Sequence, residues 1–111
     1  MKILHLPLKT KWYEMIESGV KTEEYRIQSD YWFKRLTHFL DDDFDITKGD
    51  LGIKHFDLAK FSYGYTKRTI TFEIESITIG KGKPEWGAPT EDVFIIKLGK
   101  RLNNPELLTD K

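Results

Sequence analysis

The stretch RTITFEIESITIG, residues 68–80, is typical of one long β-strand that contains an irregularity. Its apolar side chains alternate with polar ones in two groups of opposite phase: Ile70, Phe72 and Ile74, then Ile77 and Ile79. One extra residue near Glu75 or Ser76 would bring both groups to the same face of the sheet. A β-bulge of this kind bends a long strand around a small barrel, so the stretch predicts a curved sheet rather than a flat one.

Further strands and two helices are predicted on either side of this stretch. Apolar runs and alternating patterns predict strands over residues 2–8, 21–27, 53–61 and 93–98. Apolar residues at helical spacing predict helices over residues 11–18 and 31–40. Thr10 and Asp30 are the expected N-caps of these helices, and Gly19 suits the end of the first helix. The predicted fold class is therefore α+β.

The length indicates a single domain over residues 1–111. The overall composition gives the chain no electrostatic attraction to nucleic acid or membrane. Residues 101–111 show no strong pattern and are expected to fray. Lysine and arginine total 18, as do aspartate and glutamate, so any attraction to RNA must come from a local patch. The N-terminus does not resemble a signal peptide, and no apolar run approaches the ~20 residues that span a bilayer. These features favour a cytoplasmic protein without membrane contact.

Metal and thiol chemistry are not expected. The sequence has no cysteine, which excludes disulfides, thiolate zinc sites and cysteine nucleophiles. His5, His38 and His55 do not have zinc-binding spacing. The acidic segment 41–50 begins like a calcium loop but has Ile46 where glycine is required, and it is predicted to be a surface loop. No metal and no cofactor are therefore predicted.

Three segments combine aromatic rings with charged side chains: SGVKTEEYR at 18–26, SYGYTKR at 62–68 and GKGKPEWG at 80–87. In an extended strand Thr22, Glu24 and Arg26 share one face, while Tyr25 and Ile27 lie on the other and are expected to pack into the core. Rings for stacking and cations for phosphates are what recognition of single-stranded RNA requires. The residues alone leave open whether the polar face contacts solvent or a pocket.

The order LPLKTKWYEMIESGVKTEEYR resembles the signature of ASCH domains, which belong to the PUA-like superfamily. The matching positions are Leu6, Leu8, Lys9, Ile16, Ser18, Gly19, Lys21, Thr22, Glu24 and Arg26. Later segments are also similar to small bacterial and phage-associated members, so the resemblance spans residues 2 to about 99. It implies a small β-barrel of five to six mostly antiparallel strands with two flanking helices. It also implies a cleft between barrel and first helix, with Lys21, Glu24 and Arg26 in its wall.

The resemblance implies a module that binds or processes RNA, or that binds a modified nucleotide. Some members of the family are amidohydrolases that remove the acetyl group from acetylcytidine with a lysine, a threonine and a glutamate. Lys21 matches the lysine, but the expected threonine position holds Glu24, and the nearby threonine is Thr22. These three are the candidate catalytic residues. Glu73 or Glu75 is the candidate second carboxylate.

Other candidate residues would bind RNA or a nucleoside without catalysis. They are Lys9, Arg26, Tyr63, Tyr65, Lys67, Lys81, Lys83 and Trp86. In this alternative an ion pair of Glu24 with Arg26 orients a pocket, and Trp86 or Tyr65 stacks on the base. A third alternative is a protein-interaction module, because the second helix carries aromatic residues that are able to dock a partner. The oligomeric state is not predicted.

Overall fold

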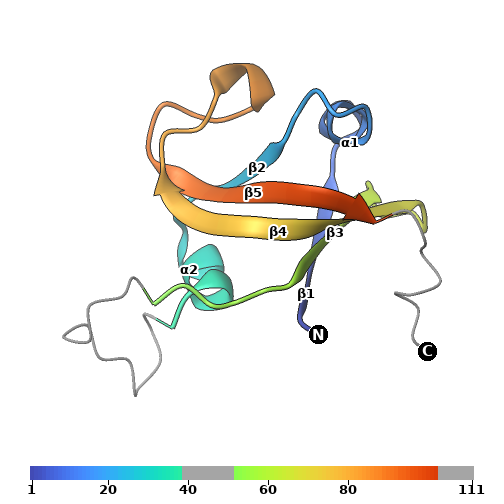
Figure 1. Cartoon of the computed structure of the whole chain (residues 1–111). Coiled ribbons are helices and arrows are strands. Elements are labelled where there is room, and N and C mark those ends of the chain that lie inside the picture. Colours follow the sequence, from blue (N-terminus) through green and yellow to red (C-terminus); the bar gives the residue numbers. More distant parts are fainter. Residues whose placement is uncertain (39–51, 103–111) are drawn as a thin grey trace.

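The computed structural model describes residues 1–38 and 52–102, which form one mixed sheet, two α-helices and a short 3-10 helix (Figure 1). In chain order the elements are β1 (Ile3–Leu8), α1 (Thr10–Glu17), β2 (Glu23–Arg26), α2 (Asp30–Leu36), β3 (Leu58–Tyr63), β4 (Thr69–Gly80), η2 (Pro84–Trp86) and β5 (Val93–Leu102). In the view of Figure 1, α1 and η2 lie above the sheet and α2 lies below it.

The sheet has five strands in the order β1-β3-β4-β5-β2 and curls into a half-barrel. The β1–β3 pair is parallel and the other three pairs are antiparallel. The two edge strands are therefore β1 and β2, which follow one another in the chain and are joined by α1. Because the sheet curves, the edges approach each other, and Arg26 on β2 donates a hydrogen bond to the Pro7 carbonyl on β1 at 3.3 Å. The α+β class is confirmed.

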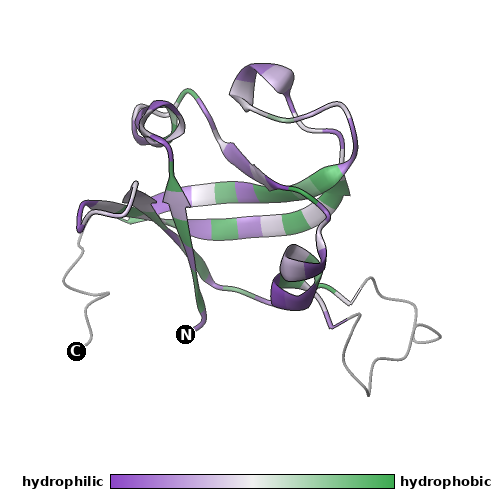
Figure 2. Cartoon of the chain, turned by 180° about the vertical axis from the view of Figure 1, so that it is seen from behind, coloured by the Kyte–Doolittle hydropathy of each residue, from purple (hydrophilic) through white to green (hydrophobic). Residues whose placement is uncertain are grey.

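The irregularity predicted in β4 is confirmed. The β4–β5 register shifts twice, between Phe72 and Ile74 and again between Ile74 and Ser76. Beyond the second shift, Ile77 lies opposite the fully buried Ile96 and packs against the same core as Phe72. Figure 2 shows apolar and polar residues alternating along β4 and β5. The shifts let one long strand keep Ile70, Phe72, Ile74 and Ile77 in or against the core of a curved sheet, whereas Ile79 is 37% exposed.

The core fills the concave side of the sheet. Its buried members come from four strands, β1, β3, β4 and β5, and from both helices: Leu4, Leu6, Leu8, Tyr13, Ile16, Leu36, Ala59, Phe61, Ile70, Phe72, Phe94, Ile96 and Leu98. Two residues of the predicted strand 21–27 were expected in the core, Tyr25 and Ile27. Tyr25 is 7% exposed and joins a second cluster with Ala88 and Val93. Ile27 is 54% exposed, so its predicted burial is wrong. The strand ends at Arg26, and Ile27 has already left the sheet.

Several predicted boundaries shift by a few residues. Helix α1 begins at Thr10 instead of being capped by it, whereas Gly19 has the left-handed φ of 88° expected after a helix. The strand predicted over 53–61 is confirmed only from Leu58, and Ile53 instead forms an isolated bridge with Thr37. Strand β5 runs on to Leu102, so residues 101 and 102 are not a frayed tail. The predicted loop 41–50 and the tail from 103 onward lie outside the described residues.

Helix α2 is shorter than predicted and starts from a different cap. Ser29, not Asp30, is the N-cap, and its hydroxyl accepts a hydrogen bond from the Trp32 backbone N–H at 3.3 Å. The helix ends at Leu36 because Thr37 has extended backbone angles, so helix is not found at 37 or 38; residues 39 and 40 are outside the described range.

Ser29→Ala is expected to lower the free energy of unfolding by about 1 kcal/mol, because it leaves a first-turn N–H of α2 without its cap. Urea denaturation followed by tryptophan fluorescence measures the change. Ser29→Asp should retain wild-type stability, since aspartate is an equally good N-cap. Equal destabilisation by both substitutions would show that the cap does not stabilise α2.

Candidate functional site

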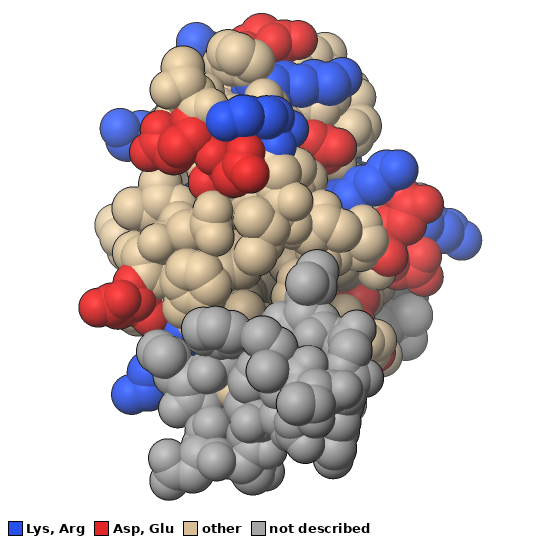
Figure 3. All heavy atoms as spheres, turned by 90° about the vertical axis from the view of Figure 1, so that its left-hand side faces the viewer, with Lys and Arg blue, Asp and Glu red and all other residues tan. Residues whose placement is uncertain are grey.

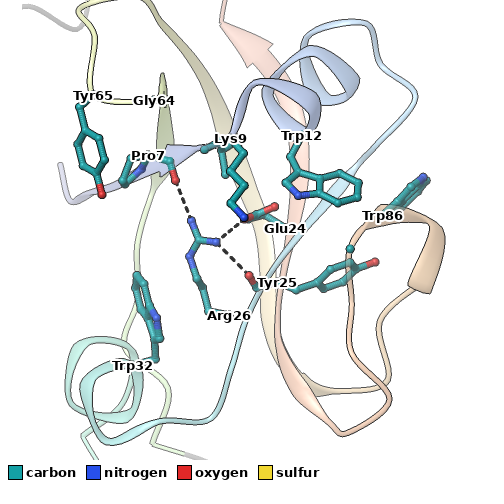
Figure 4. Close-up of a pocket in the computed structure, with 12 residues that line it drawn as sticks. Pro7, Lys9, Trp12, Glu24, Tyr25, Arg26, Trp32, Gly64, Tyr65 and Trp86 are labelled. Carbon is teal, nitrogen blue, oxygen red and sulfur yellow. Dashed lines mark hydrogen bonds and ion pairs between the residues drawn. The ribbon is translucent and has the colours of Figure 1, made fainter.

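A pocket of about 580 Å³ lies where the two edge strands of the half-barrel face each other. Its wall takes residues from β1, α1, β2, α2, the β3–β4 turn and the segment at η2: Pro7, Leu8, Lys9, Trp12, Glu24, Tyr25, Arg26, Trp32, Gly64, Tyr65, Trp86 and Gly87. Figure 4 shows these side chains arranged around the guanidinium of Arg26. Segments far apart in the sequence thus converge on one cavity.

The floor of the pocket is a buried charge network centred on Glu24, whose side chain is 6% exposed. One carboxylate oxygen lies 3.1 Å from the Lys21 ammonium, and the other accepts a hydrogen bond of 2.5 Å from Arg26. The same Arg26 nitrogen donates to the Tyr25 carbonyl at 3.2 Å, and its second nitrogen reaches Pro7 (Figure 4). Arg26 therefore fixes the carboxylate and also connects the two edge strands.

Lys21 lies behind this floor rather than in the pocket wall. The residue is 2% exposed, and its ammonium donates to the main-chain oxygen of Trp86 at 2.6 Å. It also lies 5.2 Å from the ring centroid of Trp12 and 4.7 Å from that of Tyr25. Burial lowers the pKa of Lys21 from its ordinary value, and the neighbouring Glu24 opposes that shift. A carboxylate, a carbonyl and two ring faces thus compensate the charge of the buried Lys21 ammonium.

Aromatic rings form the upper walls of the pocket, and cations lie against several of them. The Arg26 guanidinium is 5.3 Å from the ring centroid of Trp32. The ammonium of Lys83 is 4.3 Å from the ring of Trp86, and that of Lys11 is 4.7 Å from the ring of Trp12. These are distances at which a cation is attracted to the face of a ring. All three tryptophans of the chain therefore line one cavity.

The pocket carries more positive than negative charge. Lys9 is exposed and lines the cavity (Figure 4). Among the residues that line the pocket, the cations Lys9 and Arg26 outnumber the single carboxylate of Glu24. The side of the molecule shown in Figure 3 instead has cations and carboxylates next to each other. Because the whole chain has no net charge, the excess of positive charge at the pocket is a local feature.

The structure brings some of the predicted site residues together. Those that line the pocket are Lys9, Glu24, Arg26, Tyr65 and Trp86. Lys21 contacts the floor from behind, and the ammonium of Lys83 lies over the ring of Trp86. Trp12 and Trp32 were not predicted for the site, because their spacing is that of the apolar stripes of the two helices. Apart from the fact that tryptophan is a rare residue, nothing in the sequence indicates that these two side chains line the pocket.

The other predicted site residues do not line the pocket. Thr22 is exposed and precedes β2, so it does not share the inward face of Glu24. Tyr63 packs edge-on against Tyr13, with ring centroids 5.1 Å apart. Lys67 is exposed and outside the lining, and Lys81 pairs with Asp92 at 3.1 Å.

Neither candidate for the second carboxylate reaches the cavity. Glu73 and Glu75 are both exposed, and Glu75 lies 3.8 Å from Lys97 on the adjacent strand. The two register shifts of β4 occur at these residues and keep them on the convex side, while the neighbouring Ile74 stays against the core.

No cluster of metal-ligating side chains is present in residues 1–38 and 52–102. Among the same residues no helix is long and apolar enough to cross a membrane. Comparison with known proteins finds no matching protein-family model and no matching curated protein. What the chain binds has to be inferred from the chemistry of the pocket.

Proposed function

We propose that this chain is an ASCH-type module of the PUA-like superfamily that binds single-stranded RNA or a modified nucleotide, with one base in the pocket. The observation that carries the proposal is the convergence of three tryptophans on a cavity whose floor is the Glu24–Arg26 ion pair. Flat apolar walls suit the faces of a base, and a fixed polar floor suits its hydrogen-bonding edge. The volume of about 580 Å³ is within the range of small-ligand sites.

The local charge favours a ligand that carries phosphate. Lys9 at the mouth is exposed and has no ion-pair partner among the described residues. A phosphate beside the stacked base would meet this cation, and the positive excess of the pocket would add to the attraction. RNA and free nucleotides both supply such a phosphate, whereas a neutral nucleoside does not.

The hydrolase alternative has less support from the geometry. A lysine with a lowered pKa beside a carboxylate is a recognised arrangement for activating a nucleophile or water. However, the Lys21 side chain is 1% exposed, and Thr22 lies outside the pocket. Incubation with acetylcytidine followed by chromatography tests this alternative. Turnover that disappears in a Lys21→Ala variant would favour the hydrolase over a binding module.

Titration of a fluorescein-labelled single-stranded RNA, followed by anisotropy, tests the proposed function. We expect saturable, salt-sensitive binding that is several-fold weaker for Lys9→Ala. The slope of log affinity against log salt should fall by about 0.7, the value for one phosphate contact on a single strand.

Lys81→Ala is the matched control, since it removes the same charge from a lysine outside the pocket that is paired with Asp92. It should bind RNA as the wild type does. Absence of RNA binding by the wild type, or equal losses in the two variants, would contradict the proposal.

A further inference from the structure

The segment 81–92 between β4 and β5, here called the η2 loop, supplies one wall of the pocket. It folds back over the outer side of β2, where Ala88 packs with Tyr25 and Val93. This packing brings Trp86 and Gly87 to the cavity (Figure 4). The position of this wall is therefore set by how the η2 loop is attached to β2.

Two buried polar contacts attach the η2 loop, in addition to the exposed hydrogen bond that the Gln28 amide donates to the Asp92 main-chain oxygen at 3.0 Å. The ammonium of Lys21 donates to the main-chain oxygen of Trp86 at 2.6 Å. The hydroxyl of Tyr25 accepts from the backbone N–H of Lys83 at 3.0 Å and donates to Glu23 at 2.7 Å. Both anchors lie on the segment that follows α1, and both are buried. The first of them is a charge-assisted hydrogen bond, which is the stronger kind.

Lys21 is itself held at both ends. Its backbone N–H donates to the Met15 carbonyl near the end of α1 at 3.0 Å, and its ammonium lies 3.1 Å from Glu24. Through its backbone and its side chain together, Lys21 thus connects α1, the pocket floor and the η2 loop. Lys21 does not line the pocket, and its side chain is 1% exposed.

The η2 loop packs closely against β2 and α1 and has little room to move toward either of them. A Cβ on Gly82 would lie 2.7 Å from the Tyr25 ring, and a Cβ on Gly87 would lie 2.9 Å from the Trp12 ring. The loop backbone therefore touches both β2 and α1 directly. A small displacement at either contact would shift the wall that carries Trp86.

We infer that Lys21 is a positioning residue, which holds the Trp86 wall in place and orients Glu24 without touching the ligand. The part of this inference that concerns affinity rests on the proposed function. The part that concerns the wall rests only on the contacts of Lys21. A role as nucleophile or base would require the amine to leave both Glu24 and the Trp86 carbonyl before it could reach the cavity.

The test is 19F NMR of protein labelled with 5-fluorotryptophan, with the three resonances assigned by single Trp→Phe variants. Lys21→Met nearly conserves the volume of the side chain and removes the donor. In this variant we expect the Trp86 resonance to shift or broaden in the absence of RNA, while the Trp32 resonance stays in place. RNA affinity should fall about tenfold, the effect of losing a hydrogen bond that involves a charge.

Two further variants separate the possible causes. Glu24→Gln leaves the bond from Lys21 to Trp86 and should leave the Trp86 resonance in place. Gly82→Ala keeps Lys21 but places a methyl group against both Ala88 and the Tyr25 ring, so it should displace Trp86 and weaken RNA binding, even if Lys21→Met does not fold.

Three results would overturn the inference. One is a folded Lys21→Met protein with an unchanged Trp86 resonance. Another is a loss of RNA binding without movement of Trp86, because Lys21 would then contact the ligand itself. The third is a displaced Trp86 in Gly82→Ala with unchanged affinity. If the wild type binds no RNA, the proposed function fails, while the 19F spectra still decide whether Lys21 positions the wall.

Discussion

Glu24→Ala is expected to lower the free energy of unfolding by about 3–5 kcal/mol, the cost of removing one partner from a buried ion pair. Glu24 separates two cations, Lys21 and Arg26, and it contacts both. Without the carboxylate, a buried ammonium and a largely buried guanidinium would face each other across a small cavity. Neither side chain can turn to solvent easily, because Lys21 is held by Trp86 and Arg26 by Pro7.

Urea denaturation monitored by circular dichroism measures this loss. Glu75→Ala is the matched control, since Glu75 is an exposed glutamate 3.8 Å from Lys97, and its loss should change stability by less than about 0.5 kcal/mol. Glu24→Gln keeps the shape and one acceptor, so it should fall between the wild type and Glu24→Ala. A Glu24→Ala protein as stable as Glu75→Ala would show that the network contributes nothing to folding.

Trp86→Ala is expected to weaken the binding of single-stranded RNA by about 1–3 kcal/mol, roughly 5- to 150-fold. The ring is part of the pocket wall and lies 4.3 Å from the ammonium of Lys83. Its removal takes away a stacking surface and also the ring against which that cation lies. The main-chain oxygen that accepts from Lys21 is retained in the variant.

Anisotropy titration with the same labelled RNA compares Trp86→Ala with Trp86→Phe. Phenylalanine keeps an aromatic face, so Trp86→Phe should retain most of the affinity if stacking is the main interaction. Similar losses in both variants would point to the indole N–H rather than to stacking. Wild-type affinity in Trp86→Ala would mean that no base stacks on this wall.

Much of the secondary structure follows from local patterns in the sequence. The phase change in residues 68–80 predicts the irregularity of β4, because side-chain alternation is a property of the strand itself. Gly19 marks the end of α1 for a similar reason, since few other residues adopt its positive φ at low cost. Boundaries were less predictable. Whether Ser29 or Asp30 caps α2 depends on which backbone N–H its oxygen reaches.

The site was predictable only in part. Glu24, Arg26 and Trp86 stand out because charges and a tryptophan occur in short segments with glycine. Trp12 and Trp32 do not stand out, because a large ring at helical spacing has the same pattern whether it faces the core or a cavity beside it. Thr22 was misplaced because the alternation of a strand was extended beyond the residue where β2 begins.

By itself, the sequence determined the strands, the helices and the bend in β4 to within a few residues, because the apolar periodicity that predicts them is a property of each segment of the chain. The environment of Glu24 was decided only by the tertiary structure. Its ion-pair partners Lys21 and Arg26 are close to it in the chain, whereas Pro7 on β1 and Trp86 in the η2 loop reach the same pocket only in the folded, curved sheet. Closure of the half-barrel is a long-range event that removes this carboxylate from water, and no local pattern encodes it.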